Sequence, residues 1–226
     1  MSTYVVVGSS SYVAKLFVQN LSKKEKVISI SRSSSNSRIK NVLNFKTDYS
    51  KKSLNKIFNH KIFNTHNITY LFFNSLADPK AFYNLNEKEI KKIININLLQ
   101  PILFTKQILN TFSNLKINFI FISSSRAILT DEGISIYSST KNGITAFSKC
   151  MAMEYGRLNK NFRVVSLGIF KGGLKNQLSQ KNYDKIMDRT AIKKMISIKE
   201  FIKCIKFIEK DTSGNGSTIK LDNGYF

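Results

Sequence analysis

The chain has 226 residues, 42% of them hydrophobic, and 36 lysines and arginines against 14 aspartates and glutamates. Its length suits a single α/β domain with a large core. No apolar run approaches the roughly 18 residues of a membrane span and no secretory signal pattern is present, so we expect a cytoplasmic protein without a membrane anchor. Two cysteines without pairing spacing and two histidines exclude a disulfide framework and a Cys/His metal site.

The formal net charge of +22 raises nucleic acid as an alternative partner. The lysines, however, are scattered along the whole chain instead of gathering on one element with interleaved aromatic residues. We therefore interpret the charge as a solvated basic surface that also attracts phosphorylated small molecules. Duplex binding with a steep salt dependence would support the nucleic-acid alternative.

Short apolar runs bounded by polar turns alternate with segments of helical spacing. This alternation predicts a Rossmann-type, doubly wound α/β domain over residues 1–226 with a seven-stranded parallel sheet, and ligands bind such sheets beyond the carboxyl ends of the strands. The predicted strands are Tyr4–Val7, Lys26–Ile30, Val42–Phe45, Ile68–Phe73, Asn118–Ile122, Arg163–Leu167 and Thr218–Leu221. The predicted helices are Tyr12–Leu21, Ser53–Phe58, Glu87–Phe112, Tyr137–Tyr155 and Ile198–Phe207.

The turn after the first strand suits a phosphate group. Backbone N–H groups and serine hydroxyls gather there at the start of a helix, where the helix dipole favours an anion. A strand-to-helix connection with a serine N-cap gives the same pattern without any ligand, and that interpretation stays open. The candidate phosphate-binding residues are Gly8, Ser10, Ser11, Tyr12 and Val13.

Arg32 and Ser33 follow the second strand, where a dinucleotide-binding fold places the adenosine ribose. No acidic residue stands at this strand end to accept a hydrogen bond from a ribose 2′-hydroxyl. An arginine suits a 2′-phosphate instead, so the expected cofactor is NADP(H), with NAD(H) as the alternative. A solvated arginine in a basic loop is the purely structural interpretation.

Tyr137 and Lys141 stand four residues apart at the start of a predicted helix and therefore share one face. A nearby ammonium favours the phenolate form of a tyrosine, which makes the side chain useful as an acid or base near neutral pH. The same spacing also arises by chance in surface helices. Ser124, which ends the preceding strand 13 residues before Tyr137, adds a third polar group.

In this order and spacing the residues resemble the short-chain dehydrogenase/reductase family in its simple form, whose fifth strand ends in Ile-Ser-Ser, here Ile122-Ser123-Ser124. The resemblance covers essentially the whole chain. It implies that Ser124, Tyr137 and Lys141 face a nicotinamide ring. It also places further cofactor contacts at Asp48 after the third strand, at Asn74, Ser75 and Leu76 after the fourth, and at Gly168 and Ile169 after the sixth.

The resemblance implies hydride transfer between NADP(H) and a carbonyl or alcohol substrate, with Tyr137 as the general acid/base. Ser124 would polarise the substrate oxygen, and Lys141 would hold the nicotinamide ribose. Asn97, in the helix after the fourth strand, matches the family's fourth catalytic position and would support a water relay. The substrate alternatives are a 3-oxoacyl thioester and a keto-sugar or sugar nucleotide of surface-polysaccharide synthesis. Family members also pair through these helices, which implies a homodimer or homotetramer.

Two departures from the family pattern raise an alternative, which is a non-catalytic nucleotide-binding scaffold or regulatory protein. The glycine-rich turn lacks two of three glycines, with Tyr12 and Ala14 in their places. The threonine that contacts the carboxamide is also missing, its place falling at Gly172 or Gly173. Because all four catalytic positions are retained, the enzyme is the favoured interpretation.

Overall fold

The computed structural model describes residues 2–33, 39–63, 67–129, 131–171 and 180–226. In these ranges seven strands form one parallel sheet in the order β3-β2-β1-β4-β5-β6-β7, as the sequence predicts. The strands are β1 (Thr3–Val7), β2 (Lys26–Ser31), β3 (Val42–Lys46), β4 (Asn67–Phe72), β5 (Lys116–Ser124), β6 (Lys160–Leu167) and β7 (Thr218–Leu221). The α-helices are α1 (Tyr12–Leu21), α2 (Lys51–Phe58), α3 (Glu87–Ile94), α4 (Gln100–Thr111), α5 (Ser125–Leu129), α6 (Ser135–Tyr155), α7 (Gln180–Asp188) and α8 (Ile198–Lys210).

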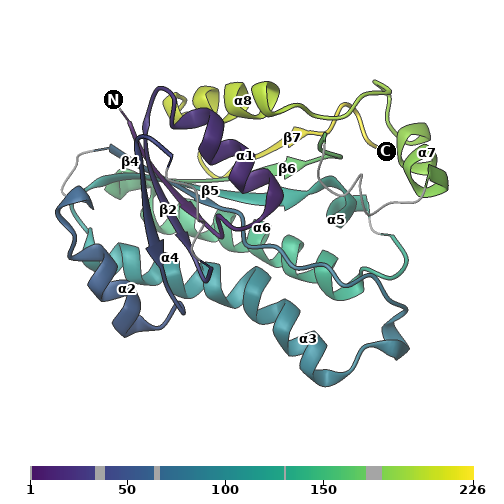
Figure 1. The fold of residues 1–226 in the computed structure, drawn as a ribbon, viewed down its shortest axis with the longest axis horizontal. Coiled ribbons are helices and arrows are strands. Elements are labelled where there is room, and N and C mark those ends of the chain that lie inside the picture. The colour runs from purple at the N-terminus through teal and green to yellow at the C-terminus, as the bar shows by residue number, and fades with distance from the viewer. Residues whose placement is uncertain (1, 34–38, 64–66, 130, 172–179) are drawn as a thin grey trace.

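Helices cover both faces of the sheet (Figure 1). Val5 and Val7 of β1 pack into the core beneath α2, α4 and α6, whereas Tyr4 and Val6 pack into the core beneath α1 and α8. Because both faces of the central strands are buried, β1, β2, β4, β5 and β6 appear in the sequence as largely apolar runs instead of alternating ones. None of the helices in the described ranges is long and apolar enough to cross a membrane.

The predicted helix Glu87–Phe112 contains a π-helical turn, η3 (Asn95–Leu99), between α3 and α4. Pro101 explains it, because proline has no N–H to donate to the carbonyl of Asn97 four residues earlier. The Gln100 N–H instead bonds the carbonyl of Asn95, five residues back. Such π turns are frequent at functional sites, and this one carries Asn97, whose side chain is 1% exposed.

Helices α5 and α7 have no counterpart in the sequence prediction. The five residues of α5 are too few to show helical periodicity, and α7 lies beyond the sixth strand in a polar, basic segment. Both helices lie at the same end of the molecule (Figure 1). In the chain, α5 directly follows the end of β5, and α7 is the next helix after β6.

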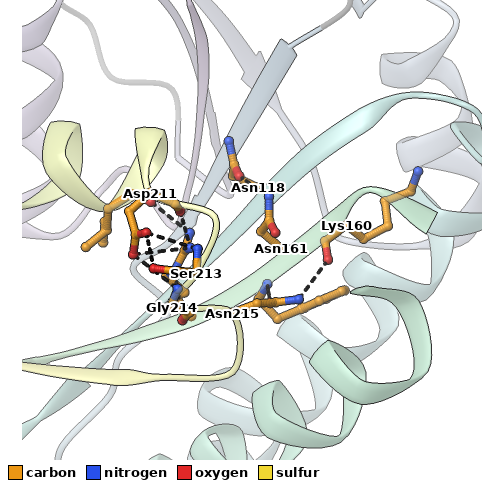
Figure 2. A network of polar contacts seen from close by, with 10 residues as sticks. Asn118, Lys160, Asn161, Asp211, Ser213, Gly214 and Asn215 are labelled. Carbon is orange, nitrogen blue, oxygen red and sulfur yellow. Dashed lines mark hydrogen bonds and ion pairs between the residues drawn. The ribbon is translucent and has the colours of Figure 1, made fainter. Parts of the chain in front are cut away.

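A buried polar network fastens the end of α8 to β6, and Figure 2 shows part of it. Arg163, which is 1% exposed, donates to the carbonyls of Ile208 (2.7 Å), Gly214 (3.0 Å) and Asp211. The Asp211 carboxylate in turn accepts from the backbone N–H of Ser213 (3.0 Å) and Gly214 (3.2 Å). One arginine therefore satisfies carbonyls that a helix end leaves without partners.

Candidate functional site

The centre of the candidate site is the ammonium group of Lys141. Its Nζ donates to the backbone carbonyls of Asn74 after β4 (2.9 Å) and Ile122 in β5 (2.9 Å). The side chain is 3% exposed, and burial lowers the pKa of Lys141 to about 7 because the charged form loses its hydration. A lysine of α6 thus ties together the carboxyl ends of two central strands.

Tyr137 lies near Lys141 on the same helix. The Lys141 Nζ lies 5.8 Å from the centroid of the Tyr137 ring, which is consistent with the shared helix face that the sequence predicts. Tyr137 and Ser124 are half-buried, in contrast to the lysine. A buried ammonium group therefore lies near the ring of a tyrosine that is partly accessible.

Asn97 clamps the loop after β4 against α6. Its Oδ1 accepts from the backbone N–H of Leu76 (2.7 Å), and its Nδ2 donates to the Leu76 carbonyl (2.9 Å) and to the Thr140 Oγ1 (3.2 Å). The Thr140 hydroxyl donates to the carbonyl of Tyr137 (2.7 Å). Thr140 is absent from the sequence prediction, although its position directly before Lys141 could have indicated it. The hydrogen bonds of Asn97 therefore position the loop of Leu76 relative to α6.

The side chain of Ser125, the residue after Ser124, is held by the carboxylate of Asp222, which follows β7. Ser125 Oγ donates to Asp222 Oδ2 (2.8 Å), and Asp222 Oδ1 accepts from the backbone N–H of Gly224 (3.1 Å). Gly168 lies against the same aspartate, since a Cβ at Gly168 would stand 2.7 Å from the Asp222 Cα. The ends of β5, β6 and β7 are therefore locked together, and Ser125 is a contributor that the sequence motifs do not mark.

The turn after β1 has the geometry of a phosphate loop. Gly8 has a φ of +75°, and a Cβ there would lie 3.0 Å from the Asn74 backbone N, so the turn needs glycine. Ser11 is the N-cap of α1 and accepts from the Ala14 N–H (3.4 Å). Tyr12 is the first helical residue and is 49% exposed. Ser10 is exposed and Val13 is half-buried.

The residues predicted for the adenosine end also lie at strand ends. Arg32 and Ser33 are exposed after β2, and the Ser33 carbonyl accepts from the Ser31 hydroxyl (2.5 Å). Asp48 is exposed after β3, and hydrogen bonds from Ser50 lower the pKa of its carboxyl group. Because β3, β2 and β1 are neighbours, these loops open on one edge of the sheet.

The other predicted cofactor-binding residues lie in the loops after β4 and β6. Ser75 is exposed and Leu76 is half-buried in the loop that Asn97 holds. Gly168 and Ile169 are half-buried after β6, and the Ile169 carbonyl accepts from the Ile196 N–H (2.9 Å). Gly172 and Gly173, the positions of the missing threonine, lie outside the described residues.

This edge of the sheet fits a dinucleotide. The Asn74 Oδ1 is buried and has no hydrogen-bond partner in the described part of the chain, so it is available to a ligand donor. The Gly8 turn leaves no room for a side chain, and the start of α1 presents free N–H groups beside it. Within the described ranges no group of three His, Cys, Asp or Glu side chains is arranged to hold a metal ion.

Curated relatives match about two thirds of the chain. The 3-oxoacyl-(acyl-carrier-protein) reductase FabG of Buchnera aphidicola subsp. Baizongia pistaciae is 26% identical over 150 residues, which are 65% of this chain and 61% of the relative. The L-xylulose reductase of Caenorhabditis elegans is 25% identical over 158 residues, 66% of this chain and 62% of the relative. The matched segments thus span about three fifths of either relative.

Solved structures match over nearly the whole chain. A short chain dehydrogenase from Bacillus anthracis superposes with a TM-score of 0.86 at 16% identity, covering 99% of this chain and 95% of that one. A 4-hydroxyisoleucine dehydrogenase complexed with NADH gives 0.83 at 16% identity, with 99% and 98% covered. These likenesses show the fold. The family model described as short chain dehydrogenase matches residues 3–183, and the chain therefore belongs to the short-chain dehydrogenase family.

Proposed function

We propose that the protein is an NADP(H)-dependent oxidoreductase that interconverts a carbonyl and an alcohol, with Tyr137 as the general acid/base. The observation that carries the proposal is the placement of Lys141, buried between the ends of β4 and β5 with Tyr137 on its open side. Strongly perturbed titratable groups at the carboxyl edge of a parallel sheet mark functional sites. Membership of the family supports the same assignment.

In the proposed reaction each side chain has a separate task. When bound, NADP(H) supplies or accepts the hydride. Tyr137 exchanges a proton with the substrate oxygen, and Ser124 donates a hydrogen bond to that oxygen as its charge develops. Lys141, whose pKa lies near neutrality, supplies a cation that stabilises the phenolate form of Tyr137. Asn97 keeps the loop of Leu76 and the first turns of α6 in place.

The cofactor would be held by the loops at the same edge. The Gly8 turn and the start of α1 accept the pyrophosphate, and Arg32 and Ser33 accept the adenosine ribose. Asp48, after β3, would contact the adenine, and Asn74, after β4, would add a further cofactor contact. Arg32 is the basis for NADP(H) over NAD(H), because a guanidinium suits a 2′-phosphate.

Two substrate classes remain in the proposal, both taken from the sequence and now supported by named relatives. A 3-oxoacyl thioester on an acidic carrier protein suits the net charge of +22 and is the substrate class in the name of the Buchnera relative. A sugar or sugar nucleotide suits the same charge, and the Caenorhabditis relative is named for a sugar. Both classes carry a carbonyl group that the same proposed mechanism would reduce.

We also propose a cytoplasmic homo-oligomer. Exposed apolar side chains lie along the α3–α4 helix and on α6, the two helices that hold Asn97 and Tyr137. They are Ile94 (39% exposed), Leu99 (45%), Leu103 (51%) and Met153 (86%). A contact surface between copies would cover them. Light scattering of the purified protein gives the number of copies.

Tyr137→Phe tests the catalytic assignment. The variant removes one hydroxyl, so it should fold and bind NADPH like the wild type while turnover of 3-oxoacyl thioesters or keto-sugars falls about 10²- to 10⁴-fold. Tyr83→Phe, at a tyrosine that is 86% exposed, is the matched control and should keep full activity. Comparable turnover in Tyr137→Phe contradicts the assignment. Nucleotide binding without turnover of either substrate class by the wild type favours the scaffold alternative.

A further inference from the structure

One carboxylate joins two arginines at the end of the molecule where α5 and α7 lie (Figure 1). Asp131 Oδ2 accepts from Arg126 Nε in α5 (2.8 Å), and Asp131 Oδ1 accepts from Nη1 of Arg189, the residue directly after α7 (2.9 Å). These three side chains, which we call the Asp131 bridge, are between 20% and 33% exposed. Burial raises the pKa of the Asp131 carboxyl group, but the two guanidiniums outweigh it and hold that pKa below its usual value. Asp131 is therefore charged at neutral pH.

Arg189 is also attached to the segment after β7. Its Nε donates to the Phe226 carbonyl (3.0 Å), and its guanidinium lies 5.1 Å from the centroid of the Tyr225 ring. The Phe226 N–H donates to the Arg189 carbonyl (2.9 Å), and the Ala191 N–H donates to the Gly224 carbonyl (2.9 Å). The chain that leaves α7 is thus paired with the segment after β7, and the Asp131 bridge adds a second attachment, to α5.

The Asp131 bridge connects two segments that follow neighbouring strands of the sheet. Residues 125–136 join β5 to α6 and lie between Ser124 and Tyr137, and residues 168–197 join β6 to α8 and contain α7. Ser124 is the register partner of Leu167, the last residue of β6. A substrate whose oxygen binds Ser124 beyond the carboxyl ends of the strands would therefore lie beside the start of the second segment.

The charge of Asp131 is what joins the two segments. Without it, two guanidiniums that now share one carboxylate would repel each other in a partly buried place, where water screens charges less than in bulk solvent. The described hydrogen bonds of the bridge involve no residue that is predicted to bind the cofactor. Loss of the charge should consequently affect the position of α7 and leave the cofactor loops as they are.

We propose that Asp131 is a positioning residue for the substrate: through Arg189 it holds the segment that contains α7 against the segment between Ser124 and Tyr137. The inference rests on the proposed function, because it concerns the substrate of the same reaction. Asp131 takes no part in the transfer of hydride or proton. Its removal should therefore weaken substrate binding much more than it slows the chemical step.

The first measurement is backbone hydrogen exchange of Asp131→Asn, a change that removes the charge and nearly keeps the shape. Exchange in residues 183–192 should be at least about tenfold faster than in the wild type, because local opening of α7 and its return chain becomes easier. Asp188→Asn is the matched control. It removes the same charge one residue before Arg189, but from a side chain that is 83% exposed, and should exchange like the wild type.

The second measurement is steady-state kinetics with a 3-oxoacyl thioester or a keto-sugar. In Asp131→Asn the KM should rise about tenfold, while kcat and the NADPH dissociation constant stay within about twofold of the wild type. Arg189→Gln breaks the bridge from its other side and should raise KM in the same way. Asp131→Glu keeps the charge and should restore most of the wild-type KM, and Asp188→Asn should leave it unchanged.

Other results overturn the inference. Unchanged exchange in Asp131→Asn shows that the bridge does not hold α7, and faster exchange with an unchanged KM makes it a structural ion pair alone. A fall in kcat without a change in KM places the effect of Asp131 on the chemical step. A wild type that turns over neither substrate class removes the proposed function together with the inference, whereas an active wild type with an equally active Asp131→Asn removes the inference only.

Discussion

Replacing Lys141 by methionine is expected to change how stability depends on pH. The Lys141 ammonium is 3% exposed and forms no ion pair in the described part of the chain; its partners are the carbonyls of Asn74 and Ile122. Burial lowers the pKa of Lys141 from its usual 10.5 to about 7. In the unfolded chain the lysine regains the usual value. Between these two values the unfolded state therefore binds more protons than the folded state.

The sign and size of the effect follow from this difference. Where the unfolded state binds more protons, the free energy of unfolding rises with pH, at up to about 1.4 kcal/mol per pH unit for one group. Integrated from about pH 7 to about pH 9 with the two pKa values, wild type gains about 2 kcal/mol relative to Lys141→Met. Methionine has no titrating group, so all other groups cancel in the comparison.

Urea unfolding of both proteins at several pH values measures the difference. Lys149→Met is the control, because Lys149 is exposed on the same helix and should give a difference that does not vary with pH. A flat difference for Lys141→Met would show that the two carbonyls keep the lysine fully charged in the fold. The cation would then be permanent, and the near-neutral pKa would have no part in the chemistry.

Two further substitutions test the packing that positions the site. Gly168→Ala should destabilise the protein by about 1 to 3 kcal/mol, because the new Cβ would stand 2.7 Å from the Asp222 Cα. Thermal unfolding measures this loss. An unchanged melting temperature would show that the chain at Asp222 moves aside without cost. Arg163→Met should lower the free energy of unfolding by about 3 kcal/mol or more, since it leaves the carbonyls of Ile208 and Gly214 without their donor. Urea unfolding measures this change. An unchanged free energy of unfolding would mean that water replaces the guanidinium as the donor.

The five central strands of the sheet could be predicted because they are buried on both faces and each appears as an apolar run. The ends of the helices were less predictable. The pattern cannot show that α2 begins at Lys51 under a Ser50 cap instead of at Ser53, because its first turn is polar. The π turn at Asn97 follows from Pro101, but hydrophobic periodicity changes too little over five residues to reveal it.

The residues of the candidate site could be predicted only where they belong to recognisable sequence motifs. The structure places Lys141 beside Tyr137 on α6 and at the ends of β4 and β5, and Asn97 holds the loop after β4. The catalytic roles of these residues stay predictions. The partners of these residues could not be predicted, because many are backbone carbonyls, which any residue supplies. The positive φ of Tyr49 could not be predicted either, because no local pattern marks a tyrosine for that conformation.

Lys141 gives the strongest physical argument for chemistry at this edge of the sheet. A buried ammonium costs stability, and an apolar side chain of similar length would fill the same space without that cost. A buried lysine with a pKa near neutrality, 5.8 Å from the ring of Tyr137, therefore supports the proposed proton transfer at Tyr137.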